Sequence, residues 1–215
     1  MKFQTCRHKN RVSTACYIVF LGMLSFSSIA LATESVTEPD SGLLIREGRL
    51  TEAVTEATKQ AESGDPEGQY QLGLFYWHGM VVTQNYSEAL KWLTLAALSD
   101  HKRAKAARLI AIRSVEETTG KKVIDWARAR LLKQANEGDE RAFQLLSASY
   151  MPEFGFENIS EAYFWSAIAV AVGQNDARRK RDELVKELSA SDLAKAQDKT
   201  AVWYTKWKET RLKQQ

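Results

Sequence analysis

Apolar residues recur at helical spacing along almost the whole chain beyond residue 42. In the stretch that begins at Ser87, small and bulky apolar residues lie three or four positions apart on one face, as Ala89, Trp92, Leu93 and Ala96 do. This spacing is typical of an amphipathic α-helix. No segment shows the sustained alternation of apolar and polar residues that indicates a half-buried strand. The pattern therefore predicts an all-α protein of about eight or nine helices, counted from start and stop signals.

Residues that start and stop helices mark the ends of a helical hairpin. Pro66 suits the first turn of a helix, and Gly79 can end that helix in the left-handed conformation. After a polar loop, Ser87 is expected to cap the second helix by accepting a hydrogen bond from its backbone. Near the C-terminus, Ser189 or Ser191 is expected to cap a later helix in the same way.

The chain contains this hairpin twice. At a spacing of 73 residues, NYSEALKW (residues 85–92) aligns with NISEAYFW (residues 158–165), with five identities in eight positions. At a spacing of 74 residues, matched pairs include Gly64 with Gly138 and Leu72 with Leu146. The spacing changes inside the loop, where a deletion disturbs the fold least. Such self-similarity indicates helix pairs that must stack on neighbours to bury their apolar faces.

The first hairpin carries a pattern of small and aromatic residues: Ala61, Gly64, Leu72, Gly73, Tyr76, Gly79, Tyr86, Ala89, Trp92, Ala96 and Ala97. This pattern resembles the Sel-one-like repeat family, a relative of the tetratricopeptide repeat. The resemblance implies a short α-α solenoid of two helix-pair repeats with linking and capping helices. The first repeat covers about 61–100, and a degenerate second repeat, with Ser147 in place of the expected glycine, covers about 135–173. Capping helices would follow over 174–215, so the repeat domain spans 43–215.

The N-terminal segment has the layout of a secretory signal peptide. A cationic start is followed by the apolar stretch YIVFLGMLSFSSIAL and by Ala30-Leu31-Ala32, a small-x-small cleavage pattern. We expect cleavage after Ala32 and a flexible linker over 33–42. Export from a bacterium would place the protein in the periplasm or outside the cell. The alternative is an uncleaved membrane anchor, although the stretch is short for a span.

The charge balance changes once this segment is set aside. Four of the 30 basic residues and none of the 27 acidic residues lie in it, so the rest of the chain is close to neutral. A near-neutral chain gives no reason to expect nucleic acid as a partner. The basic run Arg178–Arg181 is expected to be a solvated helix face, with contact to anionic lipid or polymer as the alternative.

The remaining residues offer little catalytic or metal-binding chemistry. Cys6 and Cys16 both lie in the expected signal peptide, and only His78 and His101 remain beyond it. The sequence has no HExxH, GxSxG, GxGxxG or phosphate-loop motif. We therefore expect no enzymatic activity, no catalytic residue, no metal site and no cofactor.

Partner-binding residues are expected on two parts of the solenoid. The resemblance implies that the first helix of each pair lines the concave side of the solenoid. In the second repeat, Gln144 and Leu145 correspond to candidates on the first helix of the first repeat. The loop of the second repeat, GFENISEAYFW, can present exposed aromatic side chains. The alternatives are core packing for the aromatic residues and a contact with the helix C-terminal dipole for His78. The candidates are Tyr70, Leu74, Trp77, His78, Phe154, Phe156 and Tyr163.

The family resemblance implies an adaptor role. We expect an exported, non-catalytic scaffold that mediates protein–protein interactions in the cell envelope, through a helical groove that receives a protein or peptide partner. Membrane contact is expected only if the signal segment stays uncleaved. The alternative is a ligand-binding or hydrolytic module that acts on cell-wall material, and a third possibility is a structural subunit of a larger complex.

Overall fold

The computed structural model describes residues 41–213, and within this range every regular element is helical. The ten α-helices exceed the eight or nine expected from the sequence. In order they are α1 (Ser41–Arg46), α2 (Leu50–Glu62), α3 (Pro66–His78), α4 (Tyr86–Leu98), α5 (Lys102–Ala111), α6 (Glu117–Glu137), α7 (Ala142–Ser149), α8 (Ile159–Ala171), α9 (Ala177–Val185) and α10 (Ala190–Leu212). Two 3-10 turns, η1 (Ile112–Ser114) and η2 (Pro152–Phe154), follow α5 and α7.

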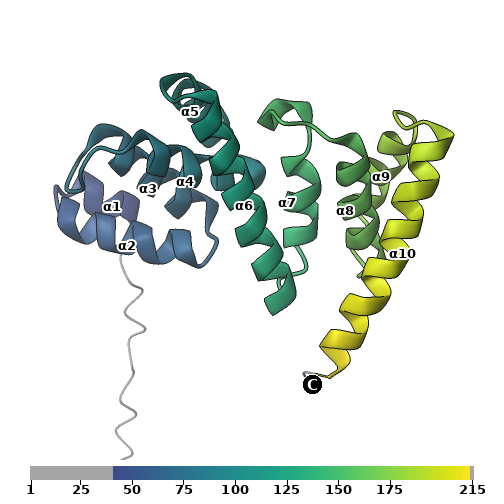
Figure 1. Cartoon of the computed structure of the whole chain (residues 1–215). Coiled ribbons are helices and arrows are strands. Elements are labelled where there is room, and N and C mark those ends of the chain that lie inside the picture. Colours follow the sequence, from purple (N-terminus) through teal and green to yellow (C-terminus); the bar gives the residue numbers. More distant parts are fainter. Residues whose placement is uncertain (1–40, 214–215) are drawn as a thin grey trace, which may run out of the picture. The chain divides into compact units, whose positions relative to one another are not determined.

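The helices follow one another along the stack (Figure 1), and most of them pack on the helices next to them in the chain. Helices α2 to α5 form one unit of four helices, and α6 to α9 repeat it in the same order. Helix α10 packs on α8 as α6 packs on α4. The all-α solenoid is confirmed, and its structural unit is larger than the helix pair, because the linking helices recur as well.

The caps of the hairpin helices follow the sequence signals with one correction. Pro66 opens α3 after Asp65, whose carboxylate accepts a 2.6 Å hydrogen bond from the Gly68 amide, and Gly79 ends α3 with φ of 65°. Helix α4, however, is capped by Asn85 and not by Ser87 as predicted. From an extended backbone, the asparagine side-chain oxygen accepts hydrogen bonds from two amides at once, those of Ser87 and Glu88.

Two glycines allow close approach between helices of the first repeat. A Cβ atom on Gly68 would lie 2.9 Å from the backbone nitrogen of Ala61 on α2. A Cβ atom on Gly73 would lie 2.8 Å from the Leu93 side chain on α4. Because both distances are shorter than van der Waals contact, α3 is held between α2 and α4 at a spacing that only glycine permits at these positions.

The repeat tryptophans lie in the core, as the sequence predicts. Trp92 is 9% exposed and Trp165 is 6% exposed. Trp203 of α10 packs edge-on against Trp165 at 5.3 Å between ring centroids, and Trp203 and Trp207 both pack edge-on against Phe143 of α7. Edge-to-face aromatic contacts of this kind add to the burial of apolar area. The aromatic residues therefore join α7, α8 and α10 into one core.

The second repeat departs from the first at the end of its first helix. Helix α7 ends at Ser149, five residues shorter than α3, and η2 follows from Pro152. The loop is held by two arginines from earlier helices. Arg108 donates to the carbonyl oxygens of Glu153 and Phe154, and Arg128 donates to the carbonyl oxygens of Ser149 and Phe156. Side chains from outside the loop thus satisfy the backbone acceptors that the shorter helix leaves free.

The expected signal peptide, 1–32, and residues 33–40 of the expected linker lie outside the described residues. The last two residues of that linker, Ser41 and Gly42, belong to α1. Leu44 holds this short helix against the core at 2% exposure, so the chain is ordered earlier than its polar composition suggests. Within residues 41–213 no helix has both the length and the hydropathy needed to cross a membrane.

Candidate partner-binding groove

Helices α1, α3 and α5 surround a hollow of about 570 Å³ at the first repeat, which we call the first-repeat groove. Its lining combines apolar, aromatic and charged side chains. The lining residues are Gly42, Ile45 and Arg46 of α1, Arg103 of α5, and Glu67, Tyr70, Gln71, Leu74, Phe75, His78 and Met80 on or just after α3.

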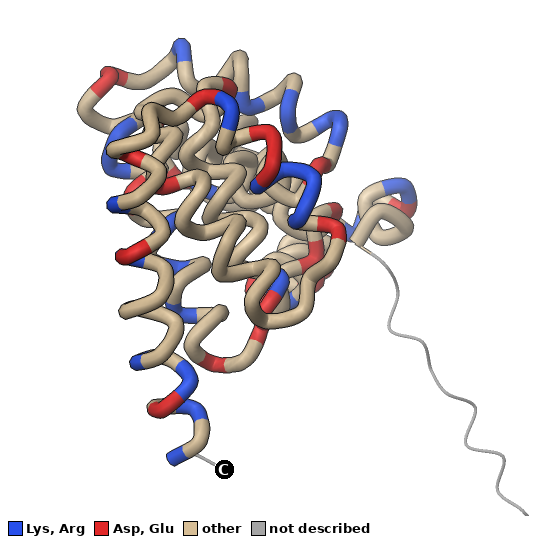
Figure 2. Tube along the Cα trace, turned by 90° about the vertical axis from the view of Figure 1, so that its right-hand side faces the viewer, with Lys and Arg blue, Asp and Glu red and all other residues tan. Residues whose placement is uncertain are grey.

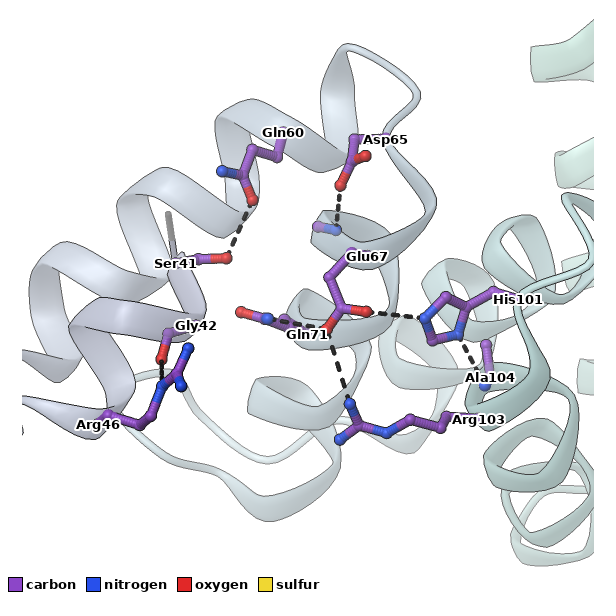
Figure 3. A network of polar contacts seen from close by, with 11 residues as sticks. Ser41, Gly42, Arg46, Gln60, Asp65, Glu67, Gln71, His101, Arg103 and Ala104 are labelled. Atoms are coloured by element: carbon purple, nitrogen blue, oxygen red, sulfur yellow. Dashed lines mark hydrogen bonds and ion pairs between the residues drawn. The ribbon is translucent and has the colours of Figure 1, made fainter. Parts of the chain in front are cut away.

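The carboxylate of Glu67 is the centre of the polar network in this groove (Figure 3). Gln71 donates to Glu67 Oε1 at 2.9 Å, and His101 Nε2 lies 2.8 Å from Glu67 Oε2. Arg103 Nη1 lies 3.9 Å from Glu67 Oε1. Partial burial by itself would raise the pKa of the Glu67 carboxyl, but the hydrogen bonds from Gln71 and His101 and the charge of Arg103 outweigh it and lower the pKa. Glu67 is therefore an anion that joins α3 to α5.

The hydrogen bonds of His101 assign its tautomer. The ring nitrogen Nδ1 accepts a 3.0 Å hydrogen bond from the Ala104 amide, because His101 is the N-cap of α5. An accepting Nδ1 carries no proton, so Nε2 carries it and donates to Glu67. Both nitrogens are thus engaged in holding two helices together, and His101 is not free to act as a general base.

Tyr70 forms the floor of the groove. Its ring stacks on the His101 ring, with centroids 4.8 Å apart, and the Arg103 guanidinium lies 4.6 Å from its centroid. Tyr70 is only 7% exposed. A buried aromatic ring against a cation is a stable platform, so Tyr70 shapes the groove while Arg103 and His78 border it as exposed residues.

Gln71 leaves one hydrogen-bond acceptor unused in the groove. Its Nε2 must face Glu67, because an amide oxygen there would oppose the carboxylate. Its Oε1 is then a buried acceptor with no partner in the described part of the chain. Gln71 itself is 8% exposed. Buried polar atoms are nearly always paired, so an incoming donor that reached this oxygen would remove an unfavourable burial.

The structure brings together three of the seven candidate residues. Tyr70, Leu74 and His78 all line the first-repeat groove, with His78 exposed at the last turn of α3. Trp77 is not among the lining residues of this groove. Its ring packs on Tyr86, 4.8 Å between centroids, and closes the hairpin loop.

The second-repeat candidates do not form a common surface. Phe154 and Tyr163 are each 5% exposed, which corrects the expectation that this loop presents them to a partner. Phe154 lies under the guanidinium of Arg108, 4.8 Å from its centroid. Phe156 is exposed at 36%, with φ of 55°. The physical reason is that Arg108 and Arg128 hold the carbonyls of the loop, whereas Tyr163 of α8 packs with Leu184 and Ala196.

The predicted counterparts of the first-repeat groove do line a hollow of their own. Gln144 and Leu145 of α7 border a space of about 250 Å³ together with Asp176 of α9. Gln144 donates a 2.9 Å hydrogen bond to Asp176. In the repeat alignment Gln144 corresponds to Tyr70 and Asp176 corresponds to Arg103, which contact each other in the first repeat. The charge at the matched position is thus reversed, from Arg103 to Asp176, and the two hollows present different chemistry.

Sequence reasoning missed several residues of the first-repeat groove, among them Ile45, Arg46 and Arg103. Ile45 and Arg46 belong to α1, a short helix directly after the predicted linker that the sequence analysis did not predict. Arg103 is the second residue of α5. The only sequence feature that could have pointed to it is its position two residues after His101, which caps that helix. In residues 41–213 no group of three or more His, Cys, Asp or Glu side chains gathers as metal ligands would.

Comparison with known proteins identifies the first hairpin. The model of the family described as the Sel1 repeat matches residues 66–101, from the first residue of α3 to the residue that caps α5. No curated protein matches the chain.

Among solved structures, the chain is similar to the crystal structure of c5321, a protective antigen present in uropathogenic Escherichia coli strains that displays an SLR fold. The two share 23% sequence identity with a TM-score of 0.33. The alignment covers 77% of this chain and 44% of that one, so this chain spans less than half of the length of its neighbour.

The family match falls on the hairpin whose caps, glycines and buried tryptophan are described above. It confirms the resemblance that the sequence pattern indicates. Residues 66–101 of this chain therefore match the Sel1 repeat, within an all-helical fold.

Proposed function

We propose that this protein is an exported adaptor that binds an extended or helical segment of a partner protein in the first-repeat groove. Sel1 repeats generally mediate protein–protein interactions, and proteins of this fold are typically non-catalytic. The adaptor role, the export and the groove as the docking site are the parts that we add. The partner would be a protein or peptide of the cell envelope.

The observation that carries the proposal is a preformed groove lined by both apolar and polar side chains. Its walls are fixed by the contacts of Glu67 with His101 and of Tyr70 with Arg103. A rigid groove loses little conformational entropy when it binds a peptide. Leu74 and Met80 offer apolar contact, and the exposed side chains of Arg103 and His78 offer polar contact.

Export is supported by the sequence of residues 1–32, which lie outside the described part. The cationic start, the apolar stretch and the small residues at 30 and 32 are those of a cleaved signal. In a bacterium such a signal delivers the protein to the periplasm or beyond. The intact mass of the protein recovered from its own cells tests this: a chain that begins at Thr33 supports export, and an intact Met1 start in the cytoplasmic fraction contradicts it.

Photo-crosslinking in the native cell tests the groove. A photoreactive residue would replace Met80 or Ile45, which border the groove at 39% and 37% exposure. The same residue at Val202, 72% exposed on α10, is the matched control. We expect one crosslinked protein from both groove positions and not from Val202.

Purified components then complete the test. The crosslinked partner should bind the purified protein, and the His78→Glu variant should weaken that binding without loss of helical content. His78 is suitable because it is exposed at the groove and its side chain makes no hydrogen bond or ion pair with the described residues. Equal crosslinking from all three positions, or equal binding of the variant, would refute the groove as the docking site.

A further inference from the structure

The outer side of α5 carries basic and aliphatic side chains and no acidic one. The stretch KRAKAARLIAIRS, residues 102–114, contains no Asp or Glu. Leu109 and Ile110 are exposed at 53% and 58%, which is unusual for two adjacent aliphatic residues on a helix. We define the α5 face by five exposed residues of α5 and one of the following turn η1: Lys102, Arg103, Lys105, Leu109, Ile110 and Arg113.

The positive charge of the α5 face is largely uncompensated. Within residues 41–213, no carboxylate lies at ion-pair distance from Lys102 or Arg113. Lys105 pairs with Asp100 at 2.5 Å, where both side chains are well exposed. Arg103 approaches Glu67 only to 3.9 Å and keeps 69% of its side chain exposed. Charge and apolar surface therefore lie side by side on one helix.

The second repeat shows that the fold does not require this apolar pair. At the spacing of 73 residues, Leu109 and Ile110 correspond to Asp182 and Glu183 of α9. Both acidic residues are exposed, as the aliphatic pair is. The position is thus a solvent position in both units, and Leu109 and Ile110 contribute little to the core. Their presence is better explained by something outside the described chain that covers them.

We propose that the α5 face binds the surface of a bilayer that contains anionic lipid. Basic side chains gain from the negative potential of such a surface, and adjacent aliphatic side chains enter the headgroup boundary. Nucleic acid fits less well, because the face offers no aromatic ring on which a base could stack. Helix α5 lies at the upper edge of the view in Figure 1.

This binding is peripheral and goes beyond the proposed adaptor role. It does not depend on the groove, although Arg103 borders both surfaces. It also does not depend on an uncleaved signal segment. Helix α10, by contrast, carries acidic as well as basic residues along its length (Figure 2).

Vesicle co-sedimentation tests the proposal. The protein would be purified in the form in which its own cells accumulate it. It would be mixed with vesicles of phosphatidylcholine alone, or of equal parts phosphatidylcholine and phosphatidylglycerol. We expect binding to the anionic vesicles only, and a decrease in binding as salt is added, because salt screens exposed charges.

Three double variants assign the binding to the α5 face. Lys102→Glu with Arg113→Glu should weaken binding about tenfold or more, since each basic residue near an anionic surface contributes roughly fivefold. Leu109→Ser with Ile110→Ser should weaken binding at every salt concentration. Lys122→Glu with Lys208→Glu makes the same charge change at exposed positions of α6 and α10 and should bind almost as the parent does. Circular dichroism would verify that each variant keeps its helical content.

Four results would overturn the proposal. They are the absence of binding to anionic vesicles, equal binding to neutral ones, equal losses in the α5 and control charge variants, and unchanged binding after the aliphatic replacements. A duplex DNA fragment should bind more weakly than the anionic vesicles. If it binds as well, and if the serine variant binds it normally, the face is a general polyanion site and the bilayer proposal is wrong.

Discussion

The guanidinium of Arg108 donates a 2.7 Å hydrogen bond to the carbonyl oxygen of Phe154, a residue 46 positions further along the chain. The same side chain donates to the Glu153 carbonyl and to the hydroxyl of Thr94. Burial lowers the pKa of this arginine, which remains a cation. Arg108 thereby fixes the loop of the second repeat to the last helix of the first, and the two units are joined by polar contacts as well as by core packing.

Replacement of Arg108 should destabilise the protein strongly. Arg108→Met keeps the volume but leaves the carbonyls of Glu153 and Phe154 without their donor, so we expect a loss of about 2–4 kcal/mol in the free energy of unfolding. The repeat-equivalent residue is the control. Arg181 pairs only with the adjacent Asp182 and keeps 29% of its side chain exposed, so Arg181→Met should change stability by less than about 0.5 kcal/mol. Urea unfolding measures both, and equal losses would contradict the clamp.

The close approach of α2 and α3 predicts a cost for any side chain at Gly68. Gly68→Ala should destabilise by about 1–3 kcal/mol, because the added methyl group meets the backbone of α2. Gly120→Ala on α6 is the matched control. There the methyl group meets only the end of the Ile112 side chain, which can move. Alanine also favours helix by roughly 1 kcal/mol, so thermal unfolding should show this variant to be as stable as the parent or more so.

The cap of α4 predicts a difference between two neighbouring residues. Asn85→Ala removes the acceptor for two backbone amides and should reduce stability by about 1 kcal/mol. Ser87→Ala removes a hydroxyl that caps nothing and should stay within about 0.5 kcal/mol of the parent. Chemical unfolding of the two variants distinguishes them. A larger loss for Ser87→Ala would restore the cap expected from the sequence.

The contacts of Glu67 predict that the stability of the protein decreases in acid. Because the pKa of Glu67 is lowered in the folded state, its contribution to stability is complete above the ordinary value of 4.5 and is lost as the pH falls through the folded-state value. Glu67→Gln removes this titration. At neutral pH the free energy of unfolding of the parent should exceed that of the variant by less than about 1 kcal/mol, since the carboxylate is partly exposed.

Melting temperatures of the parent and of Glu67→Gln, measured from neutral to strongly acid buffers, provide the test. The difference between the two should shrink below about pH 4.5. Other carboxylates with lowered pKa values, such as Asp100 and Asp192, are present in both proteins and cancel in the comparison. A difference that stays constant with pH would show that Glu67 does not act through its charge.

Part of the groove could be predicted from the sequence, because the repeat pattern showed which residues share a face of the first helix. Tyr70, Leu74 and His78 share a face of α3 by helical spacing, and the structure places all three on one hollow. The exposed fraction of each of these side chains could not be predicted from the sequence. Tyr70 is turned into the floor by His101 and Arg103, residues of a helix whose approach to α3 no local pattern encodes. The same limitation applies to Phe154 and Tyr163, which are buried by distant neighbours.

The sequence by itself determined the helices, their repetition and most of their ends. These properties depend on spacing along a few turns and on residues such as Pro66 and Gly79, whose backbone preferences act locally.

Only the tertiary structure decided which of two equivalent positions is buried. Arg108 and Arg181 hold the same place in the repeat, yet only Arg108 meets a following unit whose loop carbonyls need a donor. Burial and hydrogen-bond pairing depend on what packs against a residue, and that is a property of the assembled fold.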